Sequence, residues 1–343
     1  MDQLTNSPLS FGQEALWFIE QLSPGGSSYN VPRVYRLRGA VDLAALRAAL
    51  TVVVRRHEVL RTVYRATDGV PHQVVLPAGV ELPVTDLADL PAAQAAERAM
   101  REAAEEARRP FDLAAGPLFR ARVVRLAEAE YLLCLTMHHI CTDGWSLGVI
   151  AEELSEAYAA LAAGREPALP ELPVQFGDFA VWQREWLRGD ALERRLGYWQ
   201  ERLAGVPALE LPADRPRPPV PSFSAEAFTD RRDARFCARL RAFAQEHGVS
   251  LFVVLAAAVK VVLSRYSGQD DVAVGATVLG RDEPELERLV GYFTNLVVLR
   301  TDLSGDPSFV ELLGRVRDVT LGAYDNEVPF EKVVDRVAPV RDA

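Results

Sequence analysis

The segment from Tyr131 to Met137 constrains the fold more than any other part of the chain. Almost every residue in it is apolar, so both faces of the strand that it forms must be buried. Such a strand lies in the middle of a sheet that other elements cover on both sides. A helix is expected soon after it, from about Trp145 to Leu161. The segment therefore predicts an α/β architecture in which a central strand leads into a helix.

Helix-like and strand-like patterns alternate along the rest of the chain, as they do in α/β or α+β proteins. Tyr35 and Leu37 alternate with arginines, which predicts a strand with one solvent-facing side. Asp42 stands where a helix cap is expected, because apolar residues recur after it at three-to-four spacing. The same reasoning predicts a polar helix over 91–109 and strands over 119–123, 271–278 and 294–301.

A proline-rich segment divides the chain. Six prolines lie from Pro207 to Pro221, and such a segment can be neither a helix nor a central strand. After it, a helix is expected to end at His247, with Gly248 as its left-handed cap. We therefore expect two lobes, residues 1–172 and 173–343, with a boundary that lies anywhere up to about residue 215.

The charge of the chain argues against a nucleic-acid partner. Its 38 basic and 48 acidic residues give a formal net charge of −10, which would repel a phosphate backbone. The 49% hydrophobic and 25% charged shares are those of a soluble globular protein. Three cysteines are too few for a disulfide framework, and the N-terminus does not resemble a signal peptide. No apolar run reaches the ~20 residues of a membrane span, so we expect a cytoplasmic protein that contacts no membrane.

The most concentrated chemistry lies between the buried strand and the helix that follows it. His138 and His139 are adjacent there, and Asp143 and Gly144 come shortly after them. Loops of this kind hold ligands in open α/β sheets, and histidine exchanges protons near neutral pH. The simpler interpretation is that the backbone satisfies both histidines and that Asp143 only caps the helix. For an isolated pair of histidines, this simpler interpretation is the more common one.

Two other kinds of site share these residues. Gly144-Trp145-Ser146-Leu147-Gly148 has the G-x-S-x-G pattern of serine hydrolases, whose serine directly follows the strand, whereas His138–Asp143 intervenes here. A metal site could be drawn from Cys134, Cys141, the two histidines and Asp143. Neighbouring strand residues point to opposite faces, however, and no C-x-x-C or H-x-x-x-H spacing is present. We therefore expect no metal, and a hydrolase with Ser146 as its nucleophile is the last alternative.

Six motifs along the chain resemble those of condensation domains from nonribosomal peptide synthetases. His138-His139-x-x-x-Asp143-Gly144, followed by Trp145-Ser146, resembles the active-site signature of that family. Other acyltransferases of the chloramphenicol-acetyltransferase-like fold share its His-x-x-x-Asp-Gly part. The other motifs follow in the family's order: Ser10-Phe11-Gly12-Gln13 with Leu16-Trp17-Phe18, Arg56-His57-Glu58-Val59-Leu60-Arg61-Thr62, Gly177-Asp178-Phe179-Ala180-Val181-Trp182, Val290-Gly291-Tyr292-Phe293-Thr294-Asn295 and Val328-Pro329-Phe330-Glu331.

The resemblance implies a fold and a reaction. The fold would be an α/β sandwich of two chloramphenicol-acetyltransferase-like lobes in a V arrangement, with a tunnel between them and His139 in its middle. The reaction would join a donor aminoacyl or peptidyl thioester to the α-amine of an acceptor aminoacyl thioester. Both substrates would sit on the phosphopantetheine arms of upstream and downstream peptidyl carrier proteins, next to further synthetase domains. The domain itself would bind no cofactor.

The resemblance also implies roles for individual residues. His139 would take the amine proton or hold the amine in line, so no serine or cysteine nucleophile would be needed. His138, Asp143 and Gly144 would complete the catalytic signature. Substrate contacts would come from Trp145, Ser146, Tyr292 and Asn295, and structural support from Arg61 and Arg281. As packing residues of the motifs, Trp17, Phe179 and Trp182 are also expected in the core.

The chain departs from the family pattern at two places. Gly12 stands where alanine is usual, and the chain ends at Arg341-Asp342-Ala343, the start of the seventh motif. The resemblance therefore implies a C-terminally truncated second lobe. Residues 17–32 resemble the subgroup that takes L-configured donors. Two other functions share the same core: an epimerisation domain, which inverts the α-carbon of the donor, and a non-catalytic module that only recruits a partner.

Asp143 is expected to need a cationic partner. It precedes a helix N-terminus, where the helix dipole favours a carboxylate, and a buried carboxylate must be paired. The family resemblance implies an aspartate–arginine pair near the active site. The candidates are Arg281, just before the fifth motif, which would bridge the lobes and is our first choice, and Arg61 in the second motif. A guanidinium would give two parallel hydrogen bonds and fix the loop that carries His139.

Overall fold

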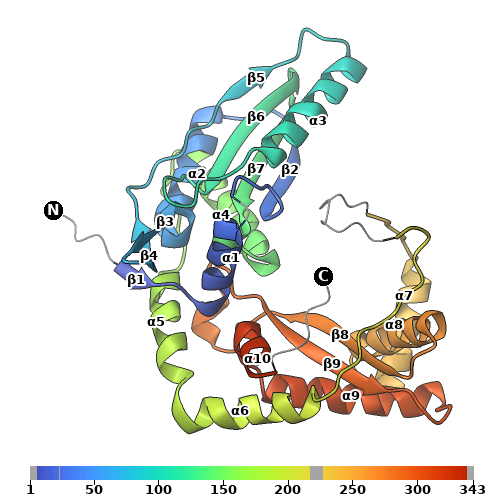
Figure 1. The fold of residues 1–343 in the computed structure, drawn as a ribbon. Helices are drawn as coiled ribbons and strands as arrows, with labels where there is room; N and C mark the ends of the chain where they lie inside the picture. The colour runs from blue at the N-terminus through green and yellow to red at the C-terminus, as the bar shows by residue number, and fades with distance from the viewer. Residues whose placement is uncertain (1–5, 23, 217–226, 338–343) are drawn as a thin grey trace. The chain divides into compact units, whose positions relative to one another are not determined.

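The computed structural model describes residues 6–22, 24–216 and 227–337, and they fold into two compact units (Figure 1). The first unit comprises the described residues up to Trp186 together with Leu279–Thr294. The second comprises Leu187–Val278 together with the described residues from Asn295 onward. Leu279–Thr294 falls within the range expected for the second lobe, whereas this segment packs in the first unit. The lobe boundary expected after residue 172 remains a prediction.

The first unit is built around a four-stranded sheet (Figure 1). Strand β7 (Glu130–His138) lies between β2 (Asn30–Arg38) and β6 (Phe119–Ala127) and is antiparallel to both. The short β5 (Val84–Asp86) pairs with β6 in parallel. Eight of the nine residues of β7 are buried, which confirms the central strand predicted from the sequence.

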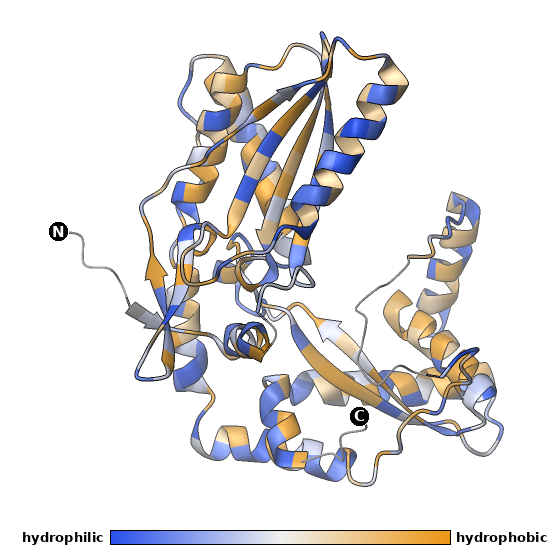
Figure 2. Ribbon diagram, turned by 45° about the horizontal axis from the view of Figure 1, so that its top comes forward, coloured by the Kyte–Doolittle hydropathy of each residue, from blue (hydrophilic) through white to orange (hydrophobic). Residues whose placement is uncertain are grey.

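Helices cover both faces of this sheet. Alternate residues of β7, such as Leu133, join the main core with α2 (Leu43–Arg56) and α4 (Gly144–Ala162). On the opposite face, Leu132 packs with α3 (Ala92–Arg108), whose buried residues are all alanines. Small side chains let this helix approach the sheet closely, and Figure 2 shows hydrophilic residues along the rest of α3. The α/β fold predicted from β7 is confirmed.

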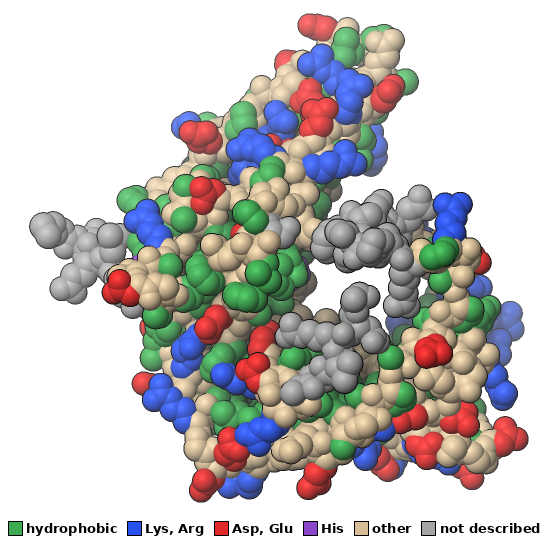
Figure 3. Space-filling model, in the orientation of Figure 1, with side chains coloured by type: hydrophobic (Ala, Val, Ile, Leu, Met, Phe, Trp, Pro, Cys, Tyr) green, Lys and Arg blue, Asp and Glu red, His purple; other side chains and the backbone are tan. Residues whose placement is uncertain are grey.

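Smaller elements complete the first unit. Helix α1 (Phe11–Leu22) buries Gln13 and Leu16 but leaves Phe18 exposed, and Figure 3 shows hydrophobic side chains gathered over this helix. The remaining elements are a second sheet of β1 (Asn6–Pro8), β4 (Val70–Val75) and β3 (Thr62–Thr67), helix α5 (Phe176–Trp186), and the short helices η1 (Glu58–Arg61), η2 (His139–Cys141) and η3 (Pro284–Leu286).

The expected core aromatics divide into two groups. Phe179 on α5 is buried, as predicted, and Trp17 packs partly buried against the main core. Trp182 is 44% exposed and stacks on Trp186, with ring centroids 5.6 Å apart. Its assignment to the core was therefore wrong, because it lies on the outer face of α5 and is covered mainly by another indole.

The second unit combines a β-hairpin with helices. Strands β8 (Asp271–Val278) and β9 (Asn295–Asp302) pair along their whole length and are largely apolar (Figure 2). Helices α8 (Leu251–Ser267) and α9 (Phe309–Asp325) share an apolar core with this hairpin. The other helices of the unit are α6 (Gly189–Arg202), α7 (Ala234–Glu246) and α10 (Phe330–Val337).

Lys260 on α8 is a buried cation in this second unit. Lys260 is 1% exposed. Its ammonium group donates hydrogen bonds to the backbone carbonyl oxygens of Val272, at 3.2 Å, and Leu299. Burial lowers the pKa of Lys260 to about 8, although Asp271 acts in the opposite direction. The lysine thus connects α8 to both strands of the hairpin.

The helix caps agree with the sequence. The Asp42 carboxylate accepts from the backbone N–H groups of Ala44 and Ala45, and Gly248 follows α7 with a positive φ of 63°. Residues 207–216 of the proline-rich segment contain neither helix nor strand. Residues 217–226 and the Arg341-Asp342 pair lie outside the described residues.

Candidate active site

The loop that carries the two histidines joins β7 to α4. Strand β7 ends at His138, a short turn of 3₁₀ helix runs over His139–Cys141, and α4 begins at Gly144. The backbone N–H of His139 donates to the carbonyl oxygen of Tyr29 at 2.8 Å, which ties the loop to the start of β2. The loop therefore begins at the end of the most buried strand of the first unit.

His138 is built into the core. His138 is 3% exposed, and its ring lies between the rings of Tyr29 and Phe111. The centroid of the imidazole is 6.2 Å from that of Tyr29 and 6.1 Å from that of Phe111. The Nδ1 atom accepts from the backbone N–H of Ile140 at 3.1 Å, so the neutral ring carries its proton on Nε2. Burial, and secondarily the neighbouring His139, lowers the pKa of His138 to about 4. His138 is thus a neutral group that shapes the loop.

His139 has one ring nitrogen that is not engaged by the loop. The ring is half-buried, and Nδ1 lies 2.7 Å from the carbonyl oxygen of Thr142. A carbonyl oxygen only accepts hydrogen bonds, so Nδ1 donates, and in the neutral ring Nε2 keeps its lone pair. The ring of Tyr292 stands edge-to-face against the imidazole, with centroids 5.1 Å apart and an angle of 81°. This arrangement is suited to accepting a proton at Nε2.

Asp143 and Arg281 form the buried ion pair predicted from the sequence. Their side chains are 1% and 3% exposed, and Nη2 of Arg281 lies 3.3 and 3.4 Å from the two carboxylate oxygens. Asp143 also caps α4, accepting from the N–H of Ser146 at 2.8 Å, and it accepts from the N–H of Phe293 at 3.1 Å. One carboxylate therefore fixes both the helix start and the 279–294 segment.

The geometry of the guanidinium differs from the parallel fork that was expected. Only Nη2 reaches Asp143, and it also donates to the Ser146 hydroxyl at 2.9 Å. Nη1 instead donates to the carbonyl oxygens of Leu286 and Leu289, and the guanidinium lies 3.9 Å from the centre of the Phe293 ring. The two backbone carbonyls thus take the donor that a parallel fork would have needed. Burial lowers the pKa of Arg281 and Asp143 acts in the opposite direction.

Arg61, the alternative partner of Asp143, lies elsewhere in the first unit. Its guanidinium donates to the carbonyl oxygen of Leu76 at 2.5 Å and to Glu58 at 3.5 Å. It thereby joins η1 to the end of β4. Support of the active-site loop by Arg61 remains a prediction.

The Ser146 hydroxyl is fully enclosed by protein groups. It lies 2.7 Å from Asp143 Oδ1 and 3.0 Å from the carbonyl oxygen of Gly291, and it accepts from the N–H of Gly291 and from Arg281. No hydrogen bond to a histidine is found among the described residues. A serine hydrolase needs a base on its nucleophile, so this arrangement does not support the hydrolase alternative.

Neither thiol near the loop is suited to nucleophilic attack. Cys141 is fully buried, and burial raises its pKa to about 12. Cys134 is also buried, and burial raises its pKa as well. The thiolate is the nucleophilic form of cysteine. Both groups therefore remain protonated thiols at neutral pH.

The predicted substrate contacts lie on different elements. Trp145 is 44% exposed at the start of α4, and its indole N–H donates to the carbonyl oxygen of Glu287 at 2.8 Å. With Gly144 it lines a groove of about 570 Å³ beside α4. Tyr292 lies against His139 in the first unit. Asn295 belongs to the second unit, where its amide donates to Glu327 and to the carbonyl oxygen of Val328.

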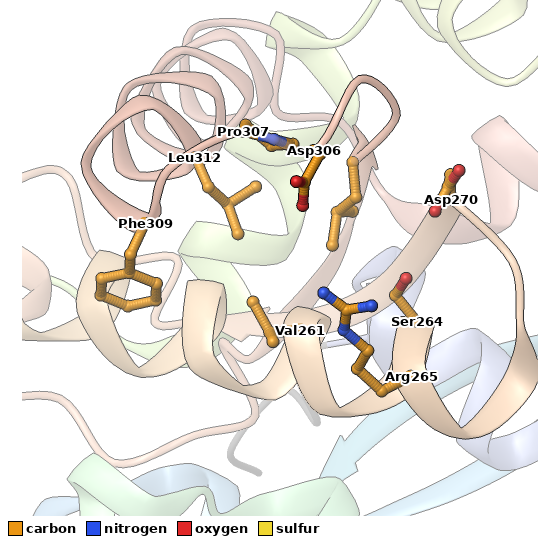
Figure 4. A pocket seen from close by; sticks show the side chains of 9 residues that line it. Val261, Ser264, Arg265, Asp270, Asp306, Pro307, Phe309 and Leu312 are labelled. Atoms are coloured by element: carbon orange, nitrogen blue, oxygen red, sulfur yellow. The ribbon is translucent and has the colours of Figure 1, made fainter.

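A separate cavity lies in the second unit, between α8 and the start of α9. It has a volume of about 400 Å³ and a mixed lining, in which the apolar Phe309 and Leu312 lie beside the charged Arg265, Asp270 and Asp306. Figure 4 shows the guanidinium of Arg265 and the carboxylate of Asp306 pointing toward one another across it. None of the predicted site residues lines this cavity.

Two buried polar groups that support the site were not singled out from the sequence. The amide of Gln13 donates to the hydroxyl of Tyr64 at 2.8 Å and to the carbonyl oxygen of Ile140 at 3.3 Å. Gln13 is fully buried and so anchors α1 to the histidine loop. The sequence signal was a glutamine inside the opening motif, three residues before the apolar Leu16-Trp17-Phe18.

The second missed group is Glu153, which organises the second motif. Its carboxylate lies 2.8 Å from Nε2 of His57 and 2.9 Å from Nε of Arg56. Burial by itself would raise the pKa of Glu153, but the hydrogen bonds and charges of His57 and Arg56 outweigh it and lower the pKa. The motif residues Arg56 and His57 thus clamp α4 against the end of α2.

Neither a metal-ligand cluster nor a single membrane-spanning helix is found in the described part of the chain. Over residues 6–22, 24–216 and 227–337, no three His, Cys, Asp or Glu side chains gather as metal ligands would. Within the same ranges no single helix has the length and apolarity to cross a membrane, and α7 and α8 meet that test only as a pair bent by 98°.

Comparison with known proteins gives concordant matches. The sequence profile of the condensation-domain family matches residues 3–343. The chondramide synthase of Chondromyces crocatus is 44% identical over 338 residues, which is 98% of this chain and 9% of that protein. The isonitrile lipopeptide synthase of Mycobacterium tuberculosis is 45% identical over 342 residues, or 97% of this chain and 14% of that protein. The chain thus spans a small part of these relatives.

Solved structures show the same fold. The X-domain from teicoplanin biosynthesis superposes with a TM-score of 0.86 and 32% identity, over 98% of this chain and 75% of that one. The first condensation domain of the calcium-dependent antibiotic synthetase, in complex with a substrate analogue, gives a TM-score of 0.82 at 22% identity, over 97% and 78% of the two chains. The second match bears on the fold alone.

Proposed function

The chain belongs to the condensation-domain family of the nonribosomal peptide synthetases, and on that premise we propose that it forms a peptide bond between two carrier-bound substrates. The donor is an aminoacyl or peptidyl thioester, and the acceptor is the α-amine of an aminoacyl thioester. Both are carried on phosphopantetheine arms of upstream and downstream peptidyl carrier proteins, within a cytoplasmic synthetase. The domain contributes no cofactor of its own.

The observation that carries this proposal is the tautomer of His139. Because Nδ1 donates to Thr142, Nε2 is free to act on the substrate amine. The amine nitrogen attacks the thioester carbonyl carbon, and its proton passes to Nε2 as the tetrahedral intermediate forms. The C–S bond then breaks, and the imidazolium returns the proton to the departing thiolate. Bonds and protons balance without any further reactant.

Neither substrate needs strong activation in this reaction. An α-amine has a pKa near 8 and a thiol one near 8.5, so amine attack and thiolate departure are both accessible at neutral pH. Holding the two reactants in line can supply about 7–11 kcal/mol of the barrier. The enclosed Ser146 hydroxyl and the buried Cys141 thiol both favour direct transfer over an acyl-enzyme. Asp143 and Arg281 serve this chemistry by fixing the loop that carries His139.

The other predicted site residues have supporting roles in this proposal. Gly144 has no side chain, which lets the protein backbone at the start of α4 approach the substrate closely. Trp145, Ser146, Tyr292 and Asn295 are assigned to substrate binding, although the hydroxyl of Ser146 is already bound by four protein groups. His138, buried at the end of β7, supports the turn that carries His139.

The direct test mixes this chain with a loaded donor carrier and a loaded acceptor carrier. We expect a dipeptidyl acceptor carrier, detected by intact-protein mass spectrometry, with the wild-type chain and not with His139→Ala. Omitting the donor carrier is the control for self-acylation. Equal product with the His139→Ala variant would reject the assignment of His139.

A recruitment module is the second candidate. Its support is the similarity to the X-domain, for which a complex with OxyB has been solved. A well-folded wild-type chain that binds a partner such as OxyB but gives no dipeptidyl product would favour this candidate. The epimerisation alternative is tested by incubating the donor carrier alone in deuterium oxide. Exchange at the α-carbon without an acceptor would support epimerisation.

A further inference from the structure

Gly12 on α1 leaves room for the ring of Tyr292. A Cβ atom added at Gly12 would lie 2.8 Å from Cε1 and 3.1 Å from Cδ1 of Tyr292. The first distance is shorter than carbon atoms approach without a bond. Any larger residue at position 12 must therefore displace the tyrosine ring. The sequence departs from the family's usual alanine at this same position.

The displaced ring would be the one that contacts His139. The hydrogen bond from Nδ1 to Thr142 holds one edge of the imidazole, and a single hydrogen bond tolerates a range of angles. Tyr292 stands almost perpendicular to the imidazole, at an angle of 81° and a centroid distance of 5.1 Å, which is a favourable geometry for two aromatic rings. The tyrosine thus limits the remaining rotation and sets where Nε2 points.

The neighbouring residue fixes the distance between α1 and the histidine loop. Gln13 is fully buried and donates to the carbonyl oxygen of Ile140 at 3.3 Å. Helix α1 cannot move away to admit a side chain at position 12 without losing this hydrogen bond. The strain of a larger residue there would consequently fall on Tyr292.

We propose that Gly12 and Tyr292 are a matched pair of positioning residues that orient the imidazole of His139. Gly12 acts through Tyr292, and Tyr292 acts through its ring contact. The consequence for turnover rests on the proposed condensation activity, whereas the consequence for the orientation of the imidazole does not.

The test uses the full chain and a double-variant cycle. The variants are Gly12→Ala, Tyr292→Leu, the two combined, and Tyr292→Phe. Gly314→Ala on α9 is the matched control, because a Cβ added there meets nothing within 4 Å. One readout is the imidazole C–H resonance of His139, assigned with His139→Ala and shifted by the ring current of Tyr292. The other is the pair of values kcat and KM for dipeptide formation.

We expect Gly12→Ala to move the His139 resonance and to lower kcat by about tenfold to hundredfold, with KM retained, since small misplacements of reacting groups have effects of this size. Tyr292→Leu should abolish the ring-current shift, and adding Gly12→Ala to it should change nothing further. Tyr292→Phe keeps the aromatic ring and should therefore keep the shift. Gly314→Ala should behave as wild type.

Two results would overturn the pairing: a wild-type His139 resonance in Gly12→Ala, or effects of the two changes that simply add. If Gly12→Ala does not fold, the His139 resonances of Tyr292→Leu and Tyr292→Phe still test whether the tyrosine ring orients the imidazole, because neither change adds volume. Equal resonances in these two variants would contradict that role. An inactive wild-type chain would count against the proposed condensation reaction, while the resonances would still report on the pair.

Discussion

The guanidinium of Arg281 lies 3.3 Å from the carboxylate of Asp143 across 138 residues of chain, and both side chains are almost completely buried. The pair does not act on the reacting atoms in the proposed mechanism. It holds the start of α4 and the 279–294 segment in one arrangement, and the histidine turn precedes that helix directly. In this proposal the carboxylate of the active-site signature has a structural role.

Removing this carboxylate should destabilise the protein. We expect Asp143→Ala to lower the free energy of unfolding by about 3–5 kcal/mol, because it leaves a buried guanidinium without its counter-ion. Urea denaturation of the full chain measures the change. Asp318→Ala is the matched control, since it breaks an ion pair whose aspartate is 67% exposed and should cost less than about 1 kcal/mol. Similar losses in the two variants would contradict the structural role of Asp143.

The two adjacent histidines should respond differently to substitution. His139→Ala should abolish dipeptide formation while the melting temperature changes little, because it removes one partly exposed hydrogen bond worth about 1 kcal/mol. His138→Ala should instead cost about 2 kcal/mol or more, because it leaves a cavity between Tyr29 and Phe111. Thermal melts and the carrier assay on the same samples separate the effects. A large loss of stability in His139→Ala would show that this ring is also structural.

Ser146→Ala tests the hydroxyl at the centre of the buried network. We expect a loss of about 1–3 kcal/mol in unfolding free energy, since Asp143, Gly291 and Arg281 each lose a partner. Condensation per folded molecule should remain largely intact. Mass spectrometry of the wild-type chain with donor alone should show no acyl adduct. A trapped acyl-serine at this position would instead establish the hydrolase chemistry.

Lys260 predicts a pH dependence for the second unit. Its pKa is lowered to about 8 in the folded state, whereas an unfolded lysine titrates near 10.4. Between these values the unfolded chain binds more protons, so stability should rise with pH from about 8 to about 10.5, by on the order of 3 kcal/mol. Below pH 8 this contribution is constant. Comparison with Lys260→Met in denaturation series isolates it from tyrosine titration, and parallel pH profiles of the two proteins would argue against the lowered pKa.

The local features of the fold could be predicted from the sequence because their causes are local. The apolar run around Leu133 fixes a buried strand, and Asp42 fixes a helix start through two backbone hydrogen bonds. The pairing of Asp143 with Arg281 was also predicted, because a buried carboxylate requires a cation and the family resemblance implies an aspartate–arginine pair near the active site. The orientation of the Arg281 guanidinium could not be predicted, because it depends on hydrogen bonds to the backbone carbonyl oxygens of Leu286 and Leu289.

Non-local packing explains what the sequence could not predict. The membership of Leu279–Thr294 in the first unit depends on contacts made by Phe293 and Arg281 with residues far away in the chain. Glu153 is one of three glutamates on α4, and only the fold brings it to His57. Trp182 matched a packing motif, yet its side of α5 faces outward. In each case the hydrophobic periodicity of one helix or strand does not show which distant segment of the chain packs against it.

The position of Arg281 in the chain has a consequence for synthesis on the ribosome. The first unit cannot be completed when residue 186 emerges, since the cation that neutralises Asp143 is translated 138 residues later. At about 5–20 residues per second, that interval is roughly ten seconds. During it the nascent chain carries a carboxylate that cannot yet be buried with its partner. The active-site loop therefore reaches its final form only after most of the second unit has been made.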